Sequence, residues 1–322
     1  MRKVKVLYLP LETVSNEWRH DVIAAIGQRH DLIIYDNNKP LAEQFEGVEV
    51  VLDTGGSVGT RQMYDAAKDV RLWQVLGTGL DHVDIAYMKT KDFMIANCPG
   101  DFSCVGLAEC AMMFILMLSR RVYEAAHNFK NQVMYKPLGC ELEGRILGII
   151  GFGSSGRELA RRAKGFGMKI HAIDVRRIEP EVQKESGVEF MGTPDDLDKV
   201  ISRADFVSLH LHLNDETRHI LNARRMGLMQ SHASIINVAR GALVDEEAMY
   251  KALLEGKLGG AGLDVFSREP PQVNLAVYNL PNVITTPHIA GSTDGTSRKR
   301  AAVAAENVDR IARKLEPMYL VD

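Results

Sequence analysis

Short apolar runs, rich in β-branched residues, alternate along the chain with longer segments of helical hydrophobic spacing. In the first hundred residues these runs lie at 4–9, 32–35, 48–52, 72–76 and 93–96. A crossover between parallel strands needs about a dozen residues, usually a helix, so this alternation predicts a parallel sheet with helices on its faces. We therefore expect an α/β fold.

A second series of apolar runs follows a long helical stretch at 107–128. We expect its strands at 146–150, 169–173, 188–191, 206–211, 234–238, 260–265 and 283–285. A last helix is expected at 297–315, where alanine and apolar residues recur at helical spacing before a proline stop at Pro317. The second series predicts a separate sheet, with a domain boundary just before residue 107.

Composition points to a small-molecule ligand. The chain has 322 residues, a net charge of -3, 46% hydrophobic and 25% charged residues, which fits an ordinary globular protein of two domains. A sequence pI near 6.4 excludes a global basic field for nucleic acid or an anionic membrane. We interpret the basic cluster at residues 298–300 as a solvated helix face.

The four cysteines suggest a reducing compartment. Cys98, Cys104, Cys110 and Cys140 form no C-x-x-C pair, so we expect reduced thiols and a cytoplasmic protein. We interpret Cys98 and Cys104 as small buried hydrophobes rather than nucleophiles. The longest apolar run, 110–118, is shorter than the roughly 18 residues that span a bilayer, and the N-terminal run lacks the features of a signal peptide.

A glycine fingerprint follows the first strand of the second series. Gly151-x-Gly153-x-x-Gly156 lies between a strand-like and a helical segment. Gly151 permits a tight turn, Gly153 lets the backbone approach a pyrophosphate, and Gly156 allows the helix to pack closely on the strand. The helix N-terminus faces the anion. We expect a dinucleotide site here.

The next strand ends in an acidic residue. Asp174 lies 174 − 151 = 23 residues after the first glycine, and an acid about 20 residues on binds the adenosine ribose hydroxyls. Its charge would repel a 2′-phosphate and so favours NAD over NADP. Arg176 and Arg177 leave NADP open, because arginines at this place can bind that phosphate.

Three further residues supply the chemistry that hydride transfer to a carbonyl needs beside the cofactor. His288 is a candidate proton donor, Glu269 a group that tunes it, and Arg240 a cation for the substrate acid. Each follows a strand-like segment, and such loops meet at the carboxyl edge of a parallel sheet, where ligands bind.

At this point the sequence resembles the D-isomer-specific 2-hydroxyacid dehydrogenases. The matching stretches, besides the fingerprint, are LGTGLDHVD at 76–84, INVARGALVDE at 236–246, GLDVFSREP at 262–270 and TPHIAGST at 286–293. The resemblance implies that His288 exchanges the proton with the substrate oxygen and that Glu269 raises the pKa of His288. It also implies that Arg240, with the backbone amides of Thr78 and Gly79, binds the substrate carboxylate.

The resemblance further implies a cofactor site, an architecture and an oligomeric state. The expected fold is two Rossmann-like, doubly wound parallel-sheet domains with the active-site cleft between them. Residues 1–103 and 292–322 would form a substrate-binding domain, and residues 104–291 an NAD-binding domain through which the chain forms a homodimer. The helical stretch at 107–128 is then an interface helix or, alternatively, an intramolecular core helix. No metal site is expected. The positions matched to the cofactor are Thr78, Gly151, Gly153, Ser154, Ser155, Gly156, Asp174, Leu211, Val238, Ala239, Arg240, Asp264, His288 and Gly291.

Comparison with the branches of the family reduces the number of candidate substrates. Glu269 argues against a formate dehydrogenase, because that branch of the family has glutamine at this position. Thr78 argues against a phosphite dehydrogenase, because that branch has lysine there. Asp53 lies near the position of an arginine in phosphoglycerate-type members, and a carboxylate there would repel a phosphate. His212 replaces a common proline, and the loop at 98–109 is one residue longer than usual.

The sequence therefore predicts an NAD-dependent dehydrogenase that interconverts a 2-keto acid, such as glyoxylate, hydroxypyruvate or a larger analogue, and its D-2-hydroxy acid. The alternative is an NAD-sensing binding protein that resembles the dehydrogenase-like transcriptional corepressors. A keto-acid turnover assay separates the two classes.

Overall fold

The computed structural model describes residues 2–55 and 59–321. The chain divides into two compact units, one formed by Met1–Phe102 with Thr293–Asp322 and the other by Ser103–Ser292. The boundaries predicted from the sequence lie one residue from these divisions. Each unit is built on its own parallel sheet.

The first unit holds a five-stranded sheet in the order β2-β1-β3-β4-β5. Every neighbouring pair is parallel. Its β3 and β4 are buried along their whole length, as expected for strands with helices on both faces. The strands are β1 (Lys5–Leu9), β2 (Asp31–Ile34), β3 (Val50–Asp53), β4 (Leu72–Val75) and β5 (Met94–Ala96).

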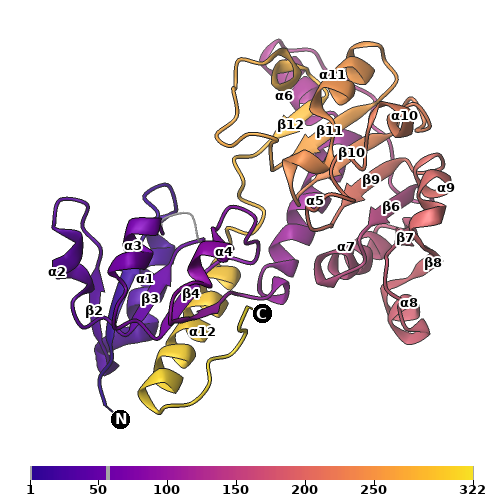
Figure 1. Cartoon of the computed structure of the whole chain (residues 1–322). Coiled ribbons are helices and arrows are strands. Elements are labelled where there is room, and N and C mark those ends of the chain that lie inside the picture. Colours follow the sequence, from indigo (N-terminus) through magenta and orange to yellow (C-terminus); the bar gives the residue numbers. More distant parts are fainter. Residues whose placement is uncertain (1, 56–58, 322) are drawn as a thin grey trace. The chain divides into compact units, whose positions relative to one another are not determined.

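Helices cover both faces of this sheet (Figure 1). On one face α1 (Asn16–Ile26) packs against α12 (Asp294–Ala312), and their apolar side chains share a core with β1, β3 and β4. The other face is covered by α2 (Leu41–Phe45), α3 (Arg61–Ala66) and α4 (Ile85–Met88). The 3-10 turns of this unit are η1 (Gly27–Arg29) and η2 (Gly100–Phe102).

Buried polar contacts attach the C-terminal helix to the N-terminal sheet. Asn307 in α12 donates to Gln74 Oε1 in β4 at 2.6 Å and accepts from the Met318 backbone N–H at 2.7 Å. His30 Nε2 lies 2.7 Å from Asp309 Oδ1, and both side chains are buried. Because buried polar groups are costly without partners, these contacts fix where α12 lies on the sheet.

The second unit holds a seven-stranded sheet in the order β12-β11-β10-β9-β6-β7-β8. The order reverses between β6 and β9, and in such sheets ligands bind at the carboxyl ends of the strands beside the reversal. The strands are β6 (Ile146–Ile150), β7 (Lys169–Ile173), β8 (Val188–Gly192), β9 (Phe206–Leu209), β10 (Ser234–Asn237), β11 (Gly260–Leu263) and β12 (Val283–Thr285).

This sheet also lies between two helical layers (Figure 1). One face packs against α5 (Cys104–Ser119) and α7 (Ser154–Gly165), and the other against α9 (Leu197–Ile201), α10 (Ala223–Met226) and α11 (Glu246–Leu254). The remaining helical elements are α6 (Val122–Lys130), α8 (Pro180–Ser186), η3 (Pro194–Asp196), η4 (Gly241–Leu243) and η5 (Ala276–Asn279). Within the described ranges, no helix is long and apolar enough to cross a membrane.

The structure confirms the α/β class and each predicted strand, but it corrects two helices. The helical stretch at 107–128 is not continuous, because Arg121 adopts a left-handed conformation (φ 49°) between α5 and α6. The last helix is α12 (Asp294–Ala312), three residues earlier at each end than predicted. Lys314, with φ 60°, follows its C-cap, so the chain turns before Pro317 is reached.

Candidate functional site

The glycine turn after β6 has the shape required for a dinucleotide. Gly151 has φ 95°, and a Cβ there would lie 2.4 Å from the His210 carbonyl oxygen. A Cβ on Gly156 would lie 2.3 Å from the Gly151 carbonyl oxygen, so α7 approaches the turn as closely as glycine allows. A Cβ on Gly153 would meet only Arg176, at 3.7 Å. The space beside Gly153 is therefore open, so a pyrophosphate could approach its backbone closely.

The first turn of α7 presents two serines beside this glycine. Ser155 Oγ lies 3.0 Å from Nδ1 of His210, whose Nε2 lies 2.9 Å from Ser208 Oγ. Burial lowers the pKa of His210 to about 4, so its imidazole is neutral and can both donate and accept a hydrogen bond. His210 thus orients the Ser155 hydroxyl at the anion-binding end of the helix. Ser154 lies beside it as the first residue of α7.

Asp174 follows β7 and is buried among donors. Its carboxylate accepts the Phe152 N–H at 2.7 Å and the Arg176 N–H at 2.9 Å. The Arg176 guanidinium adds two hydrogen bonds, at 3.0 and 3.1 Å. Burial opposes ionisation, but the hydrogen bonds from Arg176 and from the backbone lower the pKa of Asp174. The acid expected at the ribose is ionised and shares its oxygens with Arg176.

His288 and Glu269 form a hydrogen-bonded pair. The imidazole Nδ1 lies 2.7 Å from Glu269 Oε2, and Oε1 accepts the Phe266 N–H at 3.1 Å. The hydrogen bond to Glu269 raises the pKa of His288 against the opposing effect of burial. Burial likewise opposes ionisation of Glu269, yet the bond from His288 lowers the pKa of that carboxyl. The pair stabilises an imidazolium whose second nitrogen, Nε2, is left for a substrate.

Asp264 holds the loop that carries His288. Its fully buried carboxylate accepts the Thr286 hydroxyl at 2.6 Å and the N–H groups of Ile289 and Ala290 at 2.8 Å each. The Asp264 carbonyl also accepts the His288 N–H at 2.8 Å. These bonds support His288 in a left-handed conformation, φ 56°, that a non-glycine residue rarely adopts. Asp264 therefore positions the catalytic histidine candidate, a role that the sequence did not indicate.

Arg240 follows β10 and belongs to the same cluster. The Asn237 amide donates to the Arg240 carbonyl at 2.8 Å, and Arg240 Nη1 donates to the Ala239 carbonyl at 2.7 Å. A Cβ on the adjoining Gly241 would lie 1.8 Å from the Phe266 carbonyl carbon, so this loop packs directly on the one that carries Glu269. The guanidinium charge lowers the pKa values of His288 and Glu269 as a smaller contribution.

The remaining cofactor positions of this unit lie where strands end. Val238 and Ala239 are buried directly after β10. Leu211 follows β9, and its Cδ2 would lie 3.0 Å from a Cβ on Gly151. A Cβ on Gly291 would meet its first neighbour only at 3.6 Å. His212 is exposed, and the described part of the chain contains no group of three or more metal-ligating side chains.

Thr78 and Gly79 lie in the first unit, in the loop after β4. The Asn97 amide donates to the Thr78 carbonyl at 2.9 Å, and Arg300 Nη2 donates to the Thr78 hydroxyl at 3.5 Å. The backbone N–H groups of Thr78 and Gly79 donate to no acceptor among the described residues. They are available to an anionic ligand.

Two interpretations from the sequence change. Asp53 is fully buried and accepts the Trp73 indole N–H at 3.1 Å, so its charge gives no reason to exclude phosphoglycerate. Arg300 does not share the solvated face of its neighbours. It lies three residues after buried Ser297 and four before buried Ala304, a helical spacing that could have placed it inward.

The interpretation of Cys98 as a small buried hydrophobe is supported, whereas Cys104 is only half-buried. Burial raises the pKa of Cys98 to about 11 and that of Cys110 to about 12, so both are neutral thiols at physiological pH. A thiolate is the reactive form of cysteine. Neither residue is a nucleophile in this fold.

Comparison with known proteins gives consistent matches. Residues 112–290 match the family model described as D-isomer specific 2-hydroxyacid dehydrogenase, NAD binding domain. The chain is 37% identical over 272 residues to a hydroxypyruvate reductase of Thermotoga maritima, which covers 83% of this chain and 85% of that protein. It is 36% identical over 277 residues to a D-3-phosphoglycerate dehydrogenase of Methanocaldococcus jannaschii, covering 85% of this chain but only 51% of that protein. Its fold is similar to that of a glyoxylate reductase from Paecilomyes thermophila, with a TM-score of 0.81, 26% identity and coverage of 100% and 99%.

Proposed function

Because this chain belongs to the D-isomer-specific 2-hydroxyacid dehydrogenases, we propose that it reduces a small 2-keto acid such as glyoxylate or hydroxypyruvate. The protein is an NAD-dependent oxidoreductase that acts on the CH–OH group of a 2-hydroxy acid. The observation that carries the substrate proposal is the paired His288 and Glu269 beside Arg240, a proton donor next to a cation for a carboxylate. Relatives named for hydroxypyruvate and glyoxylate support the small acids.

The cofactor fits the turn after β6. Gly153 leaves an open edge for the pyrophosphate, Ser154 and Ser155 lie at the helix N-terminus, and Asp174 stands at the ribose position. When bound, the nicotinamide supplies or accepts the hydride at substrate C2. Contacts along the rest of the dinucleotide are assigned to Leu211, Val238, Ala239, Asp264 and Gly291.

The proton follows from the His288 geometry. Nδ1 is held by Glu269, so Nε2 donates the proton to the keto oxygen as C2 receives the hydride, and the alcohol and neutral imidazole are formed. In the reverse direction, neutral Nε2 accepts the hydroxyl proton. Arg240 binds the carboxylate and polarises the carbonyl, because a guanidinium pairs with a carboxylate through two parallel hydrogen bonds. The backbone N–H groups of Thr78 and Gly79 contribute to the same carboxylate.

The test is consumption of NADH with a panel of 2-keto acids of increasing size, including glyoxylate, hydroxypyruvate and 3-phosphohydroxypyruvate. We expect turnover of the small acids and formation of the D-isomer. NADH binding without turnover of any acid would instead favour an NAD-sensing binding protein.

The pairing of Asp174 with Arg176 leads to a prediction about cofactor choice. In Arg176→Ala, the carboxylate loses its neutralising partner and repels a 2′-phosphate more strongly, so the preference for NADH over NADPH should rise about three- to tenfold. The readout is the ratio of kcat/KM for the two cofactors. Arg177→Ala is the control, since that exposed side chain does not pair with Asp174. An unchanged ratio in Arg176→Ala would remove Arg176 from this role.

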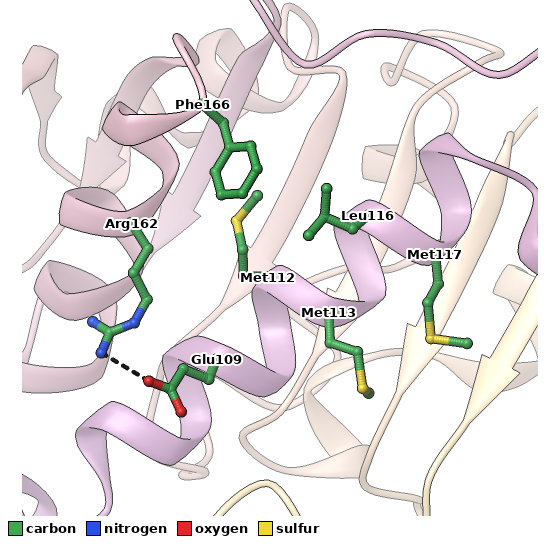
Figure 2. Close-up of a pocket in the computed structure, with 7 residues that line it drawn as sticks. All are labelled: Glu109, Met112, Met113, Leu116, Met117, Arg162 and Phe166. Carbon is green, nitrogen blue, oxygen red and sulfur yellow. Dashed lines mark hydrogen bonds and ion pairs between the residues drawn. The ribbon is translucent and has the colours of Figure 1, made fainter.

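An apolar groove between α5 and α7 supports a homodimer (Figure 2). Its volume is about 390 Å³. The segment after α6 in the same unit also exposes large apolar side chains, among them Leu138, which is 90% exposed. Exposed apolar surface of this kind is typical of an interface. The groove is lined by Glu109, Met112, Met113, Leu116, Met117, Arg162 and Phe166.

We expect Leu138→Asp to convert the dimer into a monomer, because a carboxylate would be buried in the interface without a partner. Sedimentation velocity measures the change. Leu254→Asp is the control, on α11 at the opposite face of the sheet, where the side chain is 57% exposed. A wild-type protein that sediments as a monomer would contradict the proposal.

A reducing compartment such as the cytoplasm fits the thiol chemistry. All four cysteines are free, and Cys98 and Cys110 are buried in the cores of their units. Cell fractionation with an antibody to the chain tests this placement.

A further inference from the structure

Arg300 is a half-buried cation with no carboxylate partner among the described residues. It is only partly exposed, while its neighbours Arg298 and Lys299 are exposed. Its Nε is fully buried without a hydrogen-bond partner, and Nη2 lies 3.5 Å from Thr78 Oγ1. The guanidinium carbon lies 5.2 Å from the centre of the Trp18 ring. Among the described residues, no carboxylate forms an ion pair with it.

This arrangement is costly for the folded protein alone. Removing a charge from water is unfavourable unless a paired opposite charge or several hydrogen bonds compensate, and here the contacts are one long hydrogen bond and an aromatic face. Burial lowers the pKa of Arg300, yet an arginine side chain stays protonated in proteins. A ligand anion would supply the missing partner.

The loop beside Arg300 is prepared for such an anion. The Asn97 amide donates to the Thr78 carbonyl, so that acceptor already has a partner within the protein. The Thr78 hydroxyl accepts from Arg300, so its own hydrogen is free to donate. Together with the N–H groups of Thr78 and Gly79, these donors converge on one loop without an opposing acceptor among the described residues. Clustered backbone N–H groups beside a guanidinium form an anion site.

We propose that Arg300 is a substrate-binding residue, whose guanidinium binds the carboxylate of the 2-keto acid together with the Thr78 loop. The inference rests on the proposed function, since it assigns this carboxylate to the substrate of that reaction. A planar carboxylate suits a guanidinium better than a point charge does, so lysine is a poor replacement.

A purely structural role for Arg300 and a role in substrate binding predict opposite effects of its removal on the melting temperature. If Arg300 only connected α12 to the β4 loop through Thr78 and Trp18, its removal would lower the melting temperature. If it is kept for the substrate, Arg300→Met should leave the melting temperature unchanged or raise it, because a half-buried charge with an unpartnered Nε is replaced by an apolar side chain of similar length.

The experiment compares Arg300→Met and Arg300→Lys with the control Arg298→Met. Arg298 lies on the same helix, is 63% exposed and pairs with Asp294. The probe is oxamate, a 2-keto acid analogue that is not reduced, titrated by calorimetry into the NADH-saturated protein. We expect Arg300→Met to weaken oxamate binding at least tenfold and to raise the KM for glyoxylate similarly, with kcat changed less than threefold. The oxamate affinity of Arg300→Lys should lie between those of Arg300→Met and the wild type, and that of Arg298→Met should match the wild type.

The outcomes separate this inference from the proposed function. Keto-acid turnover in the wild type with unchanged oxamate affinity in both Arg300 variants would overturn the inference and leave the function. Loss of oxamate affinity in Arg300→Met, with no keto-acid turnover in the wild type, would support the anion site and overturn the function. A lower melting temperature in Arg300→Met with wild-type oxamate affinity in Arg300→Lys would identify a structural arginine and overturn the inference.

Discussion

Replacing His288 with alanine is expected to lower kcat for keto-acid reduction about 1,000-fold at neutral pH. A positioned general acid contributes roughly 100- to 10,000-fold, and the pairing with Glu269 keeps this imidazole charged. Without it, water must protonate the developing alkoxide. Steady-state NADH consumption, corrected by single-turnover rates in case product release limits the wild type, measures the loss.

Cofactor binding separates a lost proton donor from a damaged fold. The glycine turn and Asp174 make none of their hydrogen bonds to His288, so His288→Ala should still bind NADH and lose at most the contact of His288 itself, about tenfold in affinity. His20→Ala, at an exposed position in α1, should retain full activity. If His288→Ala kept more than a tenth of the wild-type kcat, another group would have to be the acid.

Most of the fold could be predicted from the sequence because its strands are short apolar runs. The run 146–150 lies in a parallel sheet with helices on both faces, so it is continuously apolar. The break at Arg121 could not be predicted, because an arginine gives no signal for a left-handed backbone. The early end of α12 has the same cause at Lys314.

The chemistry of the site was predictable only where residue type and strand position coincide. His288, Glu269 and Arg240 each follow a strand and carry reactive groups, so the topology indicates them. The support of His288 by Asp264 depends on a loop conformation that spacing does not show. The inward turn of Arg300 breaks the rule that charged residues face water.

Both failures concern residues whose roles arise from partners distant in sequence. Arg300 meets Thr78 from 222 positions away, and Asp264 meets Ala290 from 26. A residue type that looks structural by itself acquires a function only through such contacts. Buried polar groups with few hydrogen-bond partners are therefore the positions at which further functional residues of this fold are best sought.

The second large effect is expected in the pH profile of Glu269→Gln. Reduction needs protonated His288, whose pKa Glu269 raises, so wild-type reduction should persist above the ordinary histidine pKa of about 6.5. A glutamine can still accept the Nδ1–H bond but carries no charge, so the pKa of His288 falls. The alkaline limb of kcat/KM then moves to lower pH, and the rate near pH 8 should drop tenfold or more.

The direction of that shift is the critical readout. At low pH both proteins hold protonated His288, so their rates should converge, whereas a variant with misplaced His288 would be slow at every pH. The apparent pKa of this alkaline limb belongs to the coupled pair of His288 and Glu269 rather than to either residue alone. Glu247→Gln, an exposed change on α11, should leave the profile in place. Parallel profiles for Glu269→Gln and the wild type would show that the Glu269 charge does not set the protonation of His288, leaving it only the role of orienting the ring.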